Sequence, residues 1–150
     1  MSGDDPFRLS RFLDAQTDGG TYLRAVEELR RGRKSGHWIW FVFPQLAGLG
    51  QSSTSRRFGI SSLAEAAAYL RHPVLGHRLL ECCQLLIQTK GGTAEQILGT
   101  LDALKLRSSM TLFLHAAPER AIFRQVLERY FGGRPDPLTE ELLGQGRASS

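Results

Sequence analysis

A series of helix start and stop signals constrains the fold of this 150-residue chain more than any other feature. Four stretches place a capping side chain or a proline where a helix begins: Asp5-Pro6, Ser62-Leu63-Ala64-Glu65, Thr93-Ala94-Glu95-Gln96 and Asp136-Pro137. Glycine pairs, which commonly end helices, follow at 19–20, 91–92 and 132–133. Long alternating strand patterns are absent. The sequence therefore predicts an all-α, multihelical single domain of about seven to nine helices.

The length and composition agree with one domain. Apolar residues make up 41% of the chain and charged residues 23%, an ordinary balance for a soluble globular protein. A domain of this size buries a sizeable core without disulfides or a structural metal, and we predict no cofactor. We expect a flexible N-terminus at 1–4, the helical domain at 5–143 and a disordered tail at 144–150.

The charge of the chain permits an anionic partner without requiring one. Lysine and arginine together number 19, and aspartate and glutamate number 15, so the formal net charge is +4. Because the arginines are scattered along the chain, nucleic acid is an unfavoured partner and an anionic small molecule a better one. We expect a monomer or a weak homodimer.

The two cysteines, Cys82 and Cys83, are neighbours in a predicted helix, where they cannot form an ordinary disulfide with each other. No further cysteine or paired histidine accompanies them, so we predict reduced thiols and no metal site. The chain has no apolar run of about 20 residues that would span a membrane. These features predict a cytoplasmic protein without a membrane partner.

The predicted helix at 101–116 is apolar on all sides, which is typical of a helix at the centre of a helical domain. We therefore expect the other helices to pack around it. The predicted core contains Phe12, Trp38, Phe41, Leu79, Leu104, Phe113 and Phe123.

The stretch 36–45 contains both tryptophans of the chain and has a polar residue near each end, His37 and Gln45. Its aromatic surface must lie in or beside the core, although its periodicity does not distinguish helix from strand. His37 is the best candidate in the chain for an acid, a base or a phosphate donor. Alternatively, its ring is simply hydrogen-bonded at the edge of the core. Trp38 and Trp40 could stack on a ring of a ligand.

Asp102, Lys105 and Ser109 fall on one stripe of the central helix, with the hydroxyl of Ser108 nearby. Three interpretations remain open. Asp102 and Lys105 form an internal ion pair that fixes helix packing, or the stripe is the wall of a polar cleft that faces a ligand, or one of the serines forms a nucleophile pair with the lysine.

Two further stretches concentrate cations. The cluster at 30–34 lies at the end of a helix predicted from about Thr21 to Arg31, so its charges either complement the helix dipole or form a phosphate-binding patch. The Gly- and Ser-rich loop at 48–55 precedes Arg56 and Arg57 and could hold a phosphate, but it matches no known phosphate-binding fingerprint.

Several motifs resemble those of one bacterial family, in the same order: Asp5-Pro6-Phe7, Arg11-Phe12-Leu13-Asp14-Ala15-Gln16, the stretch His37 to Gln45, Gly48-Leu49-Gly50, His72-Pro73-Val74-Leu75-Gly76 and the stretch Asp102 to Phe113. Over residues 5–143 the chain resembles the family known as domain of unknown function number 1810, whose members are often labelled calpastatin in genomes. The resemblance implies a multihelical single domain and supplies neither an activity nor catalytic residues. The calpastatin label implies nothing here, because a calpain inhibitor would be long, repetitive and disordered.

Two functions follow as hypotheses. The first is a small-ligand-binding or interaction domain with a polar pocket beside the aromatic motif. The alternative is an enzyme acting on a phosphorylated or nucleotide-like small molecule, such as one derived from NAD. The ligand-binding candidates are His37, Trp38, Trp40, Gln45, Asp102, Lys105, Ser108 and Ser109. We expect His37 and Lys105 to line one pocket floored by Trp38 or Trp40.

Overall fold

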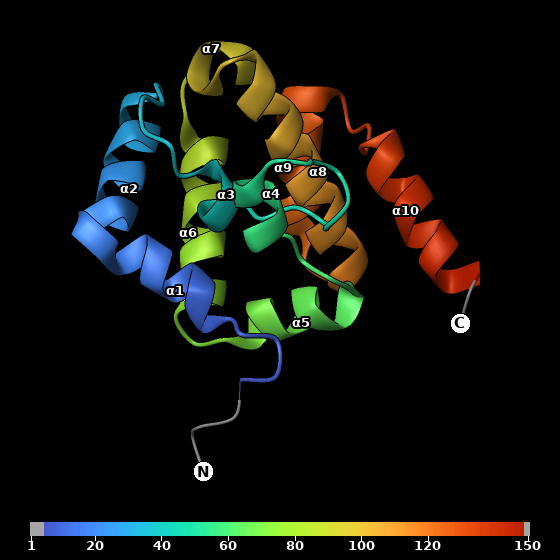
Figure 1. Ribbon diagram of the computed structural model, residues 1–150. Helices are drawn as coiled ribbons and strands as arrows, with labels where there is room; N and C mark the ends of the chain where they lie inside the picture. The colour runs from blue at the N-terminus through green and yellow to red at the C-terminus, as the bar shows by residue number, and fades with distance from the viewer. Residues whose placement is uncertain (1–4, 149–150) are drawn as a thin grey trace.

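The computed structural model describes residues 5–148, with the side chains of 145–148 excepted, and this part of the chain is all-α (Figure 1). The helices are α1 (Ser10–Thr17), the 3-10 helix η1 (Asp18–Gly20), α2 (Thr21–Arg31), α3 (Ile39–Val42), α4 (Ser53–Arg57), α5 (Leu63–Arg71), α6 (Leu75–Gln88), α7 (Ala94–Leu98), α8 (Thr100–Ala116), α9 (Ala121–Phe131) and α10 (Pro137–Ala148). Of these, α3, α4 and α7 are single turns of four or five residues. The predicted all-α fold class is confirmed.

The ends of the helical region differ from those that the sequence predicts. The carboxylate of Asp5 accepts the amides of Leu9 at 2.7 Å and Ser10 at 2.9 Å, so α1 begins at Ser10 rather than at the Asp5-Pro6 signal. At the other end, α10 continues to Ala148 and enters the segment predicted to be a disordered tail. Residues 1–4 and 149–150 lie outside the described part of the chain.

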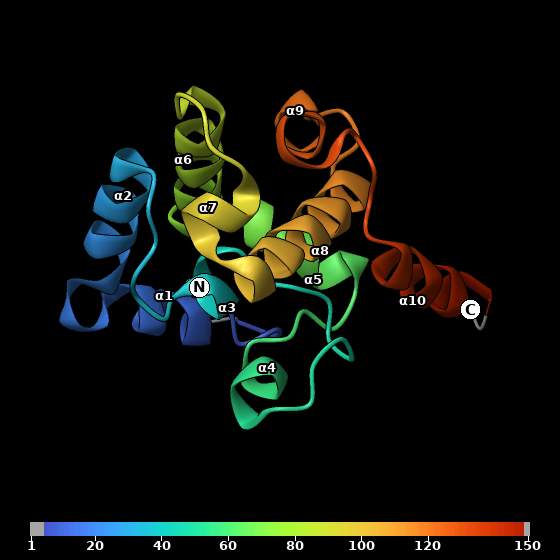
Figure 2. The same cartoon turned by 90° about the horizontal axis from the view of Figure 1, so that it is seen from above.

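The central helix is α8, which packs against α5, α7, α9 and α10 (Figures 1 and 2). Its C-terminal half is buried, and the ring of Phe113 lies 5.5 Å from that of Tyr69 and 5.7 Å from that of Phe123. Phe12, Trp38 and Leu79 are also buried, as predicted. These contacts join α8 to α5 and α9 in one continuous core.

Two residues of the predicted core are not buried inside it. Leu104 is 56% exposed and is therefore a surface residue, and Phe41 is only partly buried against the core. Leu101, one turn before Leu104, is 72% exposed. The first turns of α8 thus present an apolar face that no described element covers, so periodicity alone overestimates how much of this helix is enclosed.

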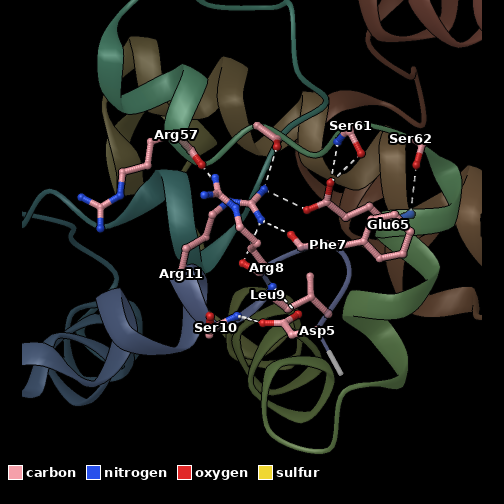
Figure 3. A network of polar contacts seen from close by, with 11 residues as sticks. Asp5, Phe7, Arg8, Leu9, Ser10, Arg11, Arg57, Ser61, Ser62 and Glu65 are labelled. Atoms are coloured by element: carbon pink, nitrogen blue, oxygen red, sulfur yellow. Dashed lines mark hydrogen bonds and ion pairs between the residues drawn. The ribbon is translucent and has the colours of Figure 1, made fainter. Parts of the chain in front are cut away.

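Arg11 fastens α1 to the segment between α4 and α5 (Figure 3). Its guanidinium donates to the carbonyls of Phe7 at 2.6 Å, Arg8 at 3.0 Å, Arg57 at 2.7 Å and Gly59 at 2.9 Å, and to Glu65 at 2.8 Å. These contacts use all five N–H groups of the arginine. Glu65 in turn accepts the amide and hydroxyl of Ser61, at 2.8 and 2.7 Å.

The capping box predicted at Ser62 is therefore only half formed. The hydroxyl of Ser62 accepts the amide of Glu65 at 3.1 Å, but the carboxylate of Glu65 is bound to Arg11 and Ser61 instead of the amide of Ser62. At α7, by contrast, the complete box between Thr93 and Gln96 is present. Within the described residues, every helix is too short or too polar to cross a bilayer.

Candidate functional site

The aromatic stretch is held by one carboxylate of α2. Oε1 of Glu28 accepts the amides of Ser35 at 2.8 Å and Gly36 at 2.9 Å and the indole N–H of Trp38 at 2.9 Å. Burial raises the pKa of Glu28, but these hydrogen bonds outweigh burial and bring its pKa below the ordinary value. Trp38 is consequently fixed in the core, immediately before the single turn of α3.

Two lysines converge on one carboxylate at the start of α8. Oδ2 of Asp102 lies 2.6 Å from Nζ of Lys34, and Oδ1 lies 3.0 Å from Nζ of Lys105. Lys34 also donates to the carbonyl of Gly36. Burial raises the pKa of Asp102, but the two ammonium groups outweigh burial, so its pKa is lower than usual. Two positive charges and one negative charge leave the group with a net charge of +1.

Each of these lysines stands over a tryptophan. Nζ of Lys34 is 5.0 Å from the ring centre of Trp38, and Nζ of Lys105 is 4.5 Å from that of Trp40. Both distances are within the range of a cation–π interaction. We call Lys34, Trp38, Trp40, Asp102 and Lys105 the lysine–tryptophan cluster. It unites the aromatic motif with the polar stripe of α8 in one place.

The cluster contains four of the eight candidate residues that the sequence indicates: Trp38, Trp40, Asp102 and Lys105. The predicted ion pair between Asp102 and Lys105 is present. His37 precedes Trp38 and its side chain is exposed to solvent. The pocket shared by His37 and Lys105 stays a prediction.

No polar contact in the described part of the chain joins Gln45, Ser108 or Ser109 to the cluster. The backbone carbonyl of Gln45 accepts the amide of Ile60 at 2.8 Å. The hydroxyl of Ser108 donates at 3.1 Å to the carboxylate of Asp136, and Asp136 is the residue that caps α10. Ser108 therefore helps to attach α10 to α8.

Ser109 is fully buried, and its hydroxyl has no hydrogen-bond partner among the described residues. An activated serine needs a hydrogen bond to its base. The ammonium of Lys105, one turn earlier in α8, is instead bound to Asp102. This arrangement does not provide the contact that a Ser109–Lys105 nucleophile pair requires.

Sequence reasoning missed Lys34 and Glu28 as parts of this site. Lys34 belongs to the cationic cluster 30–34 in the sequence, but its side chain is only 6% exposed and points to Asp102. A weak signal exists, because Gly32 ends α2 with a left-handed backbone and separates Lys34 from the helix. Nothing in the sequence marks Glu28 among the other charged residues of α2.

Comparison with solved structures shows that the fold is shared with the conserved hypothetical protein Rv1873 from Mycobacterium tuberculosis. The two chains are 54% identical and superpose with a TM-score of 0.90 over 93% of this chain and 99% of the other. Comparison with curated proteins finds no match. The family described as "Protein of unknown function (DUF1810)" matches residues 6–143, nearly the whole helical domain. The chain therefore belongs to the DUF1810 family.

Proposed function

We propose that this protein binds a small anionic ligand with a flat ring at the lysine–tryptophan cluster. The observation that carries the proposal is the convergence of Lys34 and Lys105 on the single carboxylate of Asp102. Because the two ammonium groups share one carboxylate, Lys105, the more exposed of the two, keeps N–H groups that can donate to an anion. A nucleotide-like molecule combines that anion with a ring.

Lys105 is the member of the cluster best placed to contact a ligand. Its side chain is 24% exposed, whereas that of Lys34 is 6% exposed. An ammonium has three N–H groups, and Asp102 accepts one from Lys105 in the described structure. The partly exposed ring of Trp40 lies directly beneath it and offers a surface for stacking. His37, exposed near Trp38, is a further donor for the anion.

Binding is favoured over catalysis at this site. The ammonium of Lys105 lies 3.0 Å from a carboxylate of Asp102 and contacts no hydroxyl that it could activate, so the geometry suits a donor to an anion. The alternative, an enzyme acting on a phosphorylated or nucleotide-like molecule, would have to use groups other than the hydroxyl of Ser109, which is fully buried and in contact with no base.

The test is titration calorimetry with adenosine monophosphate as the probe, with adenosine and inorganic phosphate titrated separately. We expect the monophosphate to bind more tightly than either part, and Lys105→Gln to weaken binding about tenfold, the loss of roughly one charge-assisted hydrogen bond. His37→Ala should also weaken binding if the two residues share a pocket. Incubation of the protein with the monophosphate, followed by chromatography, would detect turnover and thereby support the enzyme alternative.

Arg124→Gln is the matched control, because it removes one positive charge from an exposed position of α9. It should leave the affinity unchanged. Equal losses in Lys105→Gln and Arg124→Gln, or no binding of the monophosphate at millimolar concentration, would contradict the proposed site. Thermal melting of each variant checks that the fold is retained.

A further inference from the structure

A groove of about 490 Å³ lies where α2 and α6 end and α7 begins. In Figure 1 these three helix ends meet at the top of the molecule, and Figure 2 shows them together from above. The groove is formed by other residues than the lysine–tryptophan cluster. It is lined by the arginines at the end of α2, by the segment 88–92 and by Gln96 and Ile97 of α7.

The groove is lined by cations and neutral donors. Arg30, Arg31 and Lys90 contribute three positive charges, Gln88 and Gln96 contribute amides, and no carboxylate belongs to the lining. Arg31 lies 3.6 Å from Glu27, but both side chains are about two-thirds exposed, so this pair neutralises Arg31 only weakly. Arg30 and Lys90 form no ion pair within the described residues.

Two of the terminal carbonyls of each helix already accept hydrogen bonds from other groups. At the end of α2, the carbonyls of Glu28 and Leu29 accept the amides of Arg33 at 3.0 Å and Gly32 at 3.1 Å. At the end of α6, the hydroxyls of Thr89 and Tyr130 bind the carbonyls of Leu85 and Leu86, at 2.8 and 2.5 Å. Arg30, Arg31 and Lys90 make no side-chain hydrogen bond to a helix carbonyl in the described part of the chain.

The floor of the groove is fixed, while its rim offers free backbone donors. Ile97 is buried and its carbonyl accepts the amide of Lys34 at 2.7 Å, and the guanidinium of Arg129 binds the carbonyl of Thr89. Gly91 and Gly92 have positive φ angles of 78° and 84°, which glycine adopts without strain. Their amides donate to no acceptor in the described part of the chain, so both are available to an anion.

We propose that this groove binds a small molecule carrying two or more linked phosphate groups. Three cations around one concave surface complement several phosphate charges, and the glycine amides supply the uncharged donors that phosphate oxygens also accept. A small ligand is favoured over a nucleic acid because the volume of the groove is that of a small-molecule site. The inference goes beyond the function proposed above and depends on different residues.

The experiment is a titration of the full chain with inorganic tripolyphosphate. Binding is measured by the amide chemical shifts in nuclear magnetic resonance and, separately, by calorimetry. We expect the largest shifts at Gly91 and Gly92. Arg30→Gln and Lys90→Gln, measured separately, should each weaken binding by about fivefold to tenfold, because each removes one charged contact. Arg124→Gln removes one positive charge from an exposed position of α9 that does not line the groove, and it should have no effect.

Several results would overturn the proposal. They are a lack of binding at millimolar tripolyphosphate, shifts located away from 88–92, or an equal loss of affinity in Arg124→Gln. Tighter binding of a single-stranded oligonucleotide than of tripolyphosphate, with the steep salt dependence of nucleic-acid complexes, would also reject a small phosphate ligand. Because the substituted side chains are exposed, unchanged melting temperatures are expected, and Arg30→Lys, which keeps the charge, should retain most of the affinity.

Discussion

At the scale of single residues, Glu28 shows how one buried carboxylate organises a functional segment. It is 6% exposed, and its three hydrogen bonds all go to residues 35–38. These bonds hold the chain between α2 and α3 in the path that carries Lys34 to Asp102. Glu28 is therefore a positioning residue for the lysine–tryptophan cluster rather than a member of it.

Glu28→Gln should destabilise the protein in a manner that depends on pH. Because the pKa of Glu28 is lowered in the folded state, the unfolded state binds the proton more readily, and the stability that the charge provides is lost as pH falls through that folded pKa. We expect Glu28→Gln to cost about 1–3 kcal/mol at pH 7, since its hydrogen bonds are charge-assisted. The difference from the unmodified protein should shrink as pH falls below about 4.3.

Urea unfolding at a series of pH values measures this difference. Glu27→Gln is the control, because Glu27 is on the same helix with its side chain 65% exposed. Its effect should stay within about 0.5 kcal/mol throughout. A cost of Glu28→Gln that is the same at pH 7 and at pH 3 would refute the role of its charge.

Contacts between residues that are close in sequence could be predicted, whereas contacts between distant residues could not. The pairing of Asp102 with Lys105 could be predicted, because residues three apart on a helix are neighbours. The second partner, Lys34, is 68 positions away from Asp102, and no local rule relates the two. Likewise, the diversion of Glu65 to Arg11 depends on a contact 54 positions distant, which a capping motif cannot reveal.

At the scale of elements, α5 and α7 begin directly after the capping signals at Ser62 and Thr93, and α9 ends at the glycine pair 132–133, because caps and glycine stops act locally. The environment of α8 was harder to predict. Apolar residues lie on all of its sides, yet the stretch 108–113 is buried while Leu101 and Leu104 face solvent. Which face of a helix is covered depends on its neighbours, and the sequence of the helix does not contain that information.

Phe113→Ala and Leu104→Ala test this division of α8. Phe113 is fully buried between the rings of Tyr69 and Phe123, so its removal should cost about 3–5 kcal/mol of unfolding free energy. Leu104 is 56% exposed, and its truncation should change stability by no more than about 0.5 kcal/mol. Denaturant unfolding of both variants provides the measurement, and similar costs for the two would show that α8 is packed differently.

At the scale of the whole molecule, the all-α class was predictable from helix start and stop signals, and the central place of the 101–116 helix from the apolar residues on all of its sides. The arrangement of the helices was not, since it depends on contacts between distant segments. Both proposed binding sites illustrate this. Each lies where elements far apart in the chain meet: 34–40 with the start of α8, and the ends of α2 and α6 with α7.

Arg11 gives the most unusual consequence of such long-range contacts. Its guanidinium occupies a site whose acceptors come from residues 7–8, 57–59 and 65, and its side chain is only 13% exposed. If Arg11→Ala empties that site, the acceptors remain arranged for a planar cation with five N–H groups. The free guanidinium ion has the same head group, so it becomes a specific ligand of the variant.

In Arg11→Ala, millimolar guanidinium chloride should therefore raise the melting temperature above that in sodium chloride of equal ionic strength, because a ligand that binds only the folded state stabilises it. The unmodified protein, in which the site is filled, should show no such rise. A variant that responds identically to the two salts would argue against a preformed site. Guanidinium, which unfolds proteins at molar concentration, would here stabilise the variant at low concentration by replacing the missing head group of one arginine.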